Sequence, residues 1–106
     1  MTQKGRITHV KRAISQYYGK PITDISVNIK RYPYPLMRSL LSYFLRYKIN
    51  LGVKEIGEIV YESKDHSDAV HAIKALHRKM KKYPDVQYAF QVIEKNIDKR
   101  LKKVEA

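Results

Sequence analysis

Apolar residues recur at intervals of three and four along nearly the whole chain, and this spacing constrains the fold more than any other feature. Between residues 7 and 18, the shared helical face consists of Val10, Ala13, Ile14 and Tyr17. The ISVNI segment at residues 25–29 alternates like a strand, but no other segment offers a partner strand, so we interpret it as an extended loop. The spacing therefore predicts an all-α fold.

Glycine and proline mark where this helical spacing stops and restarts. Gly19 followed by Pro21 is typical of a helix end, and Pro35 suits the first position of the next helix. That second helix has the widest apolar face, which predicts the buried central element. Gly57 falls inside a short helix, where we expect another helix to pack closely. About five helices are predicted, over residues 7–18, 35–47, 50–60 and 65–80 and from Pro84 onward.

The length and composition indicate one domain with an anionic partner. The 106 residues lack a Gly/Ser linker, so residues 1–106 are predicted to form a single domain. The net charge is +12, and residues 1–54 hold 11 Lys/Arg against one acid. Such a field favours nucleic acid as the partner. An anionic membrane surface and a merely solubilising surface remain alternatives.

The composition also excludes several classes of protein. The absence of cysteine excludes disulfides and thiolate metal sites. The N-terminus lacks the apolar core of a signal peptide, and no apolar run approaches the roughly 20 residues of a membrane span. We therefore expect a soluble, cytoplasmic protein without a membrane partner.

A short helix over residues 50–60, a tight turn at YESK and a longer helix with a polar N-terminus form a helix-turn-helix pattern. In that motif the second helix places its N-terminal residues in the DNA major groove. In this chain those residues are Asp65, His66, Ser67 and Asp68.

At these residues the chain resembles a known family, the C-terminal DNA-binding domain of DnaA, the bacterial replication initiator. VKEIG at residues 53–57 and KDHSDAVHA at residues 64–72 are similar to the family patterns L-P-E-I-G and R-D-H-T-T-V-x-H-A. ISQYYGKPITDI, at residues 14–25, resembles that family's first helix and the turn after it. The resemblance spans about residues 7–97 and implies a Trp-repressor-like helical fold, here as a stand-alone domain without the family's ATPase domain.

The resemblance also implies a role for particular residues. Lys30 or Arg31 matches a basic loop that enters the minor groove, Arg38 matches a contact to DNA backbone or base, and Arg46 matches a phosphate contact. Asp65, where bases are read, can accept a hydrogen bond from cytosine. The complete predicted DNA-binding set is Lys30, Arg31, Arg38, Arg46, Lys54, Lys64, Asp65, His66, Ser67 and Asp68.

Some of these positions depart from the family or have a structural alternative. Asp68 stands where the family has a second threonine, residues 61–63 replace a Gly-Gly turn, and Lys54 replaces a proline. Asp65 is also a candidate N-cap, and Asp68 is a candidate first-turn acid that favours the helix dipole. His71 is predicted to face the core.

Catalysis and cofactor binding are not predicted. No G-x-x-x-x-G-K-[ST] loop for a nucleotide and no H-E-x-x-H metal motif occurs, and no nucleophile pattern accompanies His66. We therefore expect a non-enzymatic protein that binds double-stranded DNA, in control of replication initiation or in transcription regulation. The alternative is a protein-interaction adaptor, with a replication or transcription protein as partner, on a DnaA-like scaffold that has lost specific DNA reading.

Overall fold

The computed structural model describes residues 2–25, 29–63 and 66–105, and these ranges form an all-α fold, as predicted. The order of elements is α1 (Gln3–Tyr18), a 3-10 turn η1 (Ile22–Asp24), α2 (Tyr34–Tyr47), α3 (Val53–Tyr61), α4 (Ser67–Lys82) and α5 (Pro84–Glu105). Most of the ISVNI segment predicted as an extended loop lies outside the described residues.

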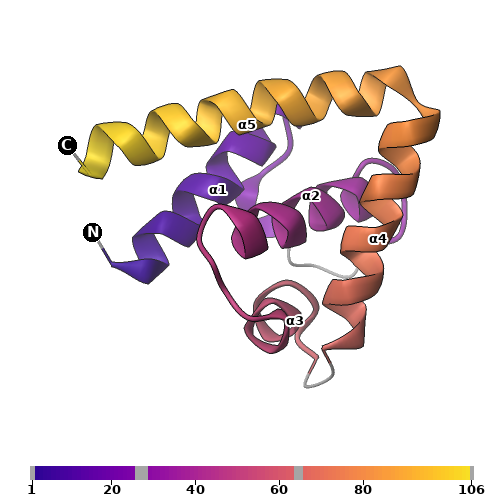
Figure 1. The fold of residues 1–106 in the computed structure, drawn as a ribbon, viewed down its shortest axis with the longest axis horizontal. Coiled ribbons are helices and arrows are strands. Elements are labelled where there is room, and N and C mark those ends of the chain that lie inside the picture. The colour runs from indigo at the N-terminus through magenta and orange to yellow at the C-terminus, as the bar shows by residue number, and fades with distance from the viewer. Residues whose placement is uncertain (1, 26–28, 64–65, 106) are drawn as a thin grey trace.

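Helix α2 is the central element, as its wide apolar face predicted. Its buried apolar side chains include Leu40, Leu41 and Phe44, each with no exposed surface. Helices α1, α3 and α4 all pack against α2, while α5 packs against α1 and α4 (Figure 1). Each fully buried side chain of this size contributes about 1.5–3 kcal/mol, and α2 supplies more buried apolar side chains than any other described helix.

Local sequence signals mark the ends of the helices, and α1 and α2 each begin earlier in the sequence than predicted. Gly19 ends α1 in the left-handed region at φ 66°, and its N–H donates to the carbonyl of Ser15 at 2.8 Å. Helix α1 begins at Gln3 rather than residue 7, because the Thr2 hydroxyl caps it by accepting from the N–H of Gly5. Helix α2 begins at Tyr34, so Pro35 occupies its second position rather than its first.

The arrangement in space separates two ends of the molecule. Helix α5 runs along one side with α1 next to it, and α3 with the start of α4 lies at the opposite side (Figure 1). An aromatic cluster joins α2 to α5, with the rings of Phe44 and Phe90 stacked at 4.9 Å and Tyr43 edge-on to Phe90 at 5.1 Å. Within the described ranges, no helix combines the length and apolarity needed to cross a membrane.

Candidate nucleic-acid interface

The predicted short helix, turn and longer helix are present as α3, the residues after it, and α4. Ile56 and Val60 of α3 are buried, as is Ala69 near the start of α4, and the two helices pack together. Gly57 is buried within α3, in keeping with the close packing predicted for it. This packing holds the polar first turn of α4 at one end of the molecule (Figure 1).

The turn after α3 uses an unusual residue. Glu62 adopts the left-handed conformation at φ 54°, and the N–H of Ser63 donates to the carbonyl of Gly57 at 3.1 Å. Glycine commonly fills such a position because a side chain is strained there. Glu62 falls where the resemblance places a Gly-Gly turn, so this chain makes the same kind of helix end with a strained acidic residue.

Helix α4 covers Ser67–Lys82, two residues later at each end than predicted. The residue that precedes it is His66, not Asp65, and the predicted capping role of Asp65 lies outside the described residues, as does Lys64. Asp68 is exposed in the first turn, where the helix dipole favours an acid. The later end of α4 follows from Pro84, which disfavours a helical conformation at Tyr83, and Tyr83 is extended.

The prediction that His71 faces the core is wrong, because His71 is exposed. The core side of α4 is formed by Ala69, Ala72, Ile73 and Leu76. His71 lies opposite this apolar face, and so do Lys74 and Arg78, which are also exposed. None of these three residues was predicted as a candidate contact from the sequence. Their three- and four-residue spacing from Ser67, complementary to the apolar face, was the signal for them.

Arg46 and Lys54 are exposed and lie close to this surface. Arg46, in the last turn of α2, donates from Nη1 to the carbonyl of Leu51 at 3.1 Å, which ties α2 to the segment before α3. Arg46 also lines a hollow of about 290 Å³ together with Lys74 of α4. The structure therefore brings a predicted phosphate contact next to a basic residue that the sequence analysis missed.

Lys30 and Arg31 are exposed in the loop before α2. The carbonyl of Arg31 accepts from the N–H of Tyr34 at 3.0 Å, so a turn leads from this loop into the helix. Lys30 lines a hollow with Lys79 of α4, which lies 12 residues beyond Ser67. At 1.5 Å per residue, the basic loop therefore lies about 18 Å along α4 from its first turn.

Arg38 is placed differently from its predicted role, because only 6% of it is exposed. Its Nη2 donates to the carbonyl of Ile29 at 2.7 Å, immediately before Lys30 and Arg31. Arg38 and Ser42 also lie within hydrogen-bonding reach of the Tyr61 hydroxyl at the end of α3. Burial raises the pKa of Tyr61, and both neighbours act against this rise. Arg38 thus connects the basic loop, α2 and α3 from the inside of the molecule.

No group of three or more His, Asp or Glu side chains suited to a metal ion occurs in the part of the chain that the structure describes. The candidate site consists of a polar face of α4, flanking cations and a basic loop. Its lysine, arginine, histidine and serine side chains are donors for anions and for base edges.

These features define a class of protein: within the described ranges, five α-helices, with a basic loop before the central one and a short helix–turn–long helix at one end. No protein-family model matches the chain, and no solved structure matches it. Chromosomal replication initiator protein DnaA 1 of Chlamydia pneumoniae is 32% identical over 103 residues, which covers 94% of this chain and 22% of that protein. DnaA 2 of Chlamydia caviae is 29% identical over 97 residues, covering 91% of the chain and 21% of the relative.

DnaA 1 of Chlamydia trachomatis is 30% identical over 91 residues, covering 83% of the chain and 20% of the relative. The chain is therefore a homologue of the C-terminal region of the DnaA replication initiators. The resemblance predicted from its motifs is confirmed. The chain spans about a fifth of the length of the curated relatives it matches.

Proposed function

We propose that the chain binds double-stranded DNA, with the first turns of α4 in the major groove and the basic loop of Lys30 and Arg31 in the adjacent minor groove. The observation that carries this proposal is the outer face of α4, where His71, Lys74 and Arg78 are all exposed opposite the packed face. A helix presented in this way fits the width of the major groove.

The separation between the two contact regions supports this arrangement. The basic loop lies beside Lys79, about 18 Å along α4 from Ser67. A full turn of DNA measures about 34–36 Å, so half a turn, which separates a major groove from the next minor groove, is about 17–18 Å. The same duplex can therefore meet both regions.

In this proposal, one set of residues supplies affinity for DNA and another set recognises the base sequence. His66 and Ser67, at the start of α4, read base edges, because hydroxyl and imidazole groups exchange hydrogen bonds with them. Phosphate contacts come from the flanking cations, which supply affinity without sequence information. Those cations are Lys30, Arg31, Arg46, Lys54, Lys74 and Arg78.

Asp68 makes the surface of this chain differ from the family pattern. Its carboxylate is exposed in the first turn of α4, next to the residues assigned to base reading. An anion there repels phosphates, and in the major groove it pairs only with a donor such as cytosine N4. We therefore propose that the chain prefers a DNA site different from that of its DnaA relatives.

The names of the relatives describe chromosomal replication initiators, and we propose that DNA binding by this chain acts in control of replication initiation or in transcription regulation. The proposed role is non-enzymatic.

Fluorescence anisotropy with labelled duplexes of varied sequence, at 50 and 200 mM salt, tests DNA binding. With about six phosphate contacts, affinity should fall roughly a thousandfold between these two salt concentrations. Lys74→Ala should weaken binding to every duplex and reduce the salt slope by about 0.9. Arg12→Ala, an exposed cation on α1, which contributes no residue to the proposed surface, is the matched control and should bind like the wild type.

Absence of salt-sensitive binding to any duplex would refute the proposal. Recovery of a protein partner that resists nuclease, together with no DNA binding, would instead support the adaptor alternative.

A further inference from the structure

A second basic surface lies between α1 and the C-terminal half of α5, which pack side by side away from α3 (Figure 1). We call it the α1–α5 groove, a hollow of about 490 Å³ lined by His9, Gln16, Asn96, Lys99, Arg100 and Lys103. None of these residues belongs to the surface proposed to meet DNA through α4.

Arg100 is held in this groove by neutral groups. Its Nε donates to Asn96 Oδ1 at 3.1 Å, and its Nη2 donates to Gln16 Oε1 at 3.0 Å. Asn96 Nδ2 donates to the same Gln16 oxygen at 3.1 Å, so the three side chains form one network across α1 and α5. Amide oxygens orient the guanidinium without cancelling its charge, which leaves Nη1 as a preset donor for an anion.

A row of lysines extends the positive charge along α5. Lys95, Lys99 and Lys103 are exposed and follow one another at intervals of four residues, so they share a face and lie about 6 Å apart along the axis. On the other wall, His9 and Gln16 of α1 line the groove, and α1 contains no acidic residue. An elongated anion with regularly spaced charges matches this row better than a single small ion.

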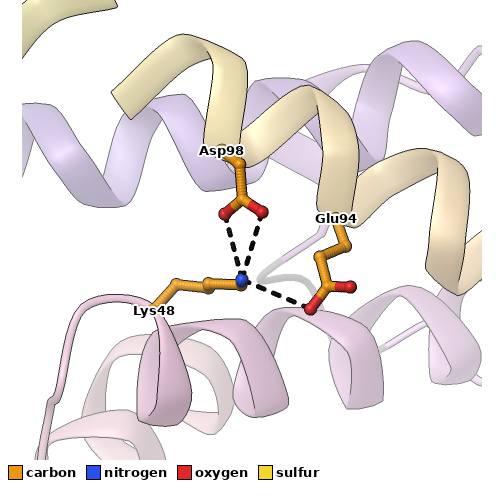
Figure 2. A network of polar contacts seen from close by, with 3 residues as sticks. All are labelled: Lys48, Glu94 and Asp98. Carbon is orange, nitrogen blue, oxygen red and sulfur yellow. Dashed lines mark hydrogen bonds and ion pairs between the residues drawn. The ribbon is translucent and has the colours of Figure 1, made fainter. Parts of the chain in front are cut away.

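The nearby acidic residues of α5 pair with Lys48 and not with the lysines of the row. Lys48 at the end of α2 lies between two of them, with its Nζ 3.0 Å from Asp98 Oδ1 and 3.3 Å from Glu94 Oε2 (Figure 2). Burial lowers the pKa of Lys48, but the hydrogen bonds to Asp98 and Glu94 outweigh this effect and raise it. Each carboxylate precedes a lysine of the row by one residue, which places it about 100° around the helix from that lysine.

The groove cations therefore remain uncompensated. Among the residues that the structure describes, none of Lys95, Lys99, Arg100 and Lys103 forms an ion pair with a carboxylate. A guanidinium held in position beside a row of lysines is suited to bind the phosphates of a nucleic-acid backbone.

We propose that the α1–α5 groove binds the phosphate backbone of a second DNA segment, so that one chain holds two duplexes. The bridging of two duplexes rests on the proposed function of α4, whereas binding in the groove does not. Because the groove offers a charge row and no helix for base reading, it binds the second segment without sequence preference.

A capture assay tests the bridge. A specific duplex is fixed to beads, the protein is added, and retention of a second, fluorescent duplex is measured. Lys99→Glu with Lys103→Glu should reduce the retained second duplex by about tenfold or more, because two phosphate contacts become repulsive. Lys81→Glu with Lys82→Glu, at exposed positions in the last turn of α4, makes the same change in net charge and is the control. Retention is measured at protein concentrations that saturate the first duplex with each variant, because Lys82 lies over the ring of Tyr83, which lines the hollow with Lys30. Under these conditions the control should retain the second duplex.

An NMR titration locates the second contact. In a Lys74→Glu, Arg78→Glu variant, added duplex should shift amide signals of residues 9–16 and 95–103, and the same spectrum verifies folding. Unshifted groove signals, or wild-type retention by the Lys99→Glu, Lys103→Glu variant, would overturn the proposal while leaving the α4 function intact. Vesicles of anionic lipid that bind through Lys99 when duplex does not would also overturn it, in favour of a membrane surface. Loss of all DNA binding on changing the groove alone would refute the proposed function of α4 instead.

Discussion

Replacing Arg38 with methionine removes the guanidinium while keeping most of the apolar stem of this buried side chain. In the structure the guanidinium donates to the carbonyl of Ile29 at 2.7 Å and lies within reach of the Tyr61 hydroxyl. The change therefore disconnects the loop of Lys30 and Arg31 from α2 and α3. We expect it to reduce both stability and DNA affinity, although Arg38 itself has little surface with which to touch DNA.

The expected loss of stability follows from these contacts. A hydrogen bond from a charged donor contributes about 1.5–3 kcal/mol, and a buried carbonyl left without a partner adds a further penalty of about 1 kcal/mol. The sum predicts a fall of about 2.5–4 kcal/mol in the free energy of unfolding. Small domains are stable by about 5–15 kcal/mol, so the variant should remain folded.

Urea denaturation followed by circular dichroism measures this loss. With a slope of about 1–3 kcal/mol per molar urea, the midpoint should fall by roughly 1–4 M. Arg31→Met is the control, because Arg31 is exposed: it should weaken DNA binding and change stability by less than about 0.5 kcal/mol. If Arg38→Met lost DNA binding with unchanged stability, Arg38 would contact DNA directly and its assignment as a buried connector would be wrong.

Three further changes test the turn and the reading end of α4. Glu62→Gly should stabilise the fold by about 1 kcal/mol in thermal melts, because it removes strain at φ 54°; Glu62→Ala, which keeps the Cβ, should not. Asp68→Asn should raise duplex affinity about fivefold by relieving roughly 1 kcal/mol of repulsion. The same change should lower the free energy of unfolding by about 0.3–1 kcal/mol, because it removes a favourable interaction with the helix dipole. Unchanged affinity for the duplex would place Asp68 away from DNA. His66→Ala or Ser67→Ala should change preference on a panel of base-substituted duplexes by about 1–3 kcal/mol at single positions. Arg46→Ala should weaken all duplexes alike, and identical behaviour of the two classes would contradict the assigned roles.

Part of the candidate site was predictable because its signals are local. The exposure of Lys30, Arg31, Arg46 and Lys54 follows from charge, since unpaired Lys and Arg rarely lie fully buried. The same rule fails for Arg38, whose burial is compensated by a carbonyl nine residues away. No local pattern indicates that such a partner exists.

His71 shows the opposite error. Histidine is intermediate in burial, so its type alone does not decide which way it points. The register of the apolar face of α4 decided it, since Ala69, Ala72 and Ile73 turn toward the neighbouring helices and leave His71 outside.

By itself the sequence determined the helical class, the helix boundaries at Tyr18, Tyr47 and Pro84 and the excess of positive charge. Periodicity, glycine and proline act over a few residues, and net charge needs no geometry. Only the tertiary structure decided which charges are buried, which carboxylates pair with Lys48 and which cations form no ion pair. Gln16 and Arg100 meet across 84 residues of chain, and the α1–α5 groove exists only because packing places them together. Contacts at such separations depend on how all the helices bury their apolar faces together. No single segment of the sequence specifies that arrangement.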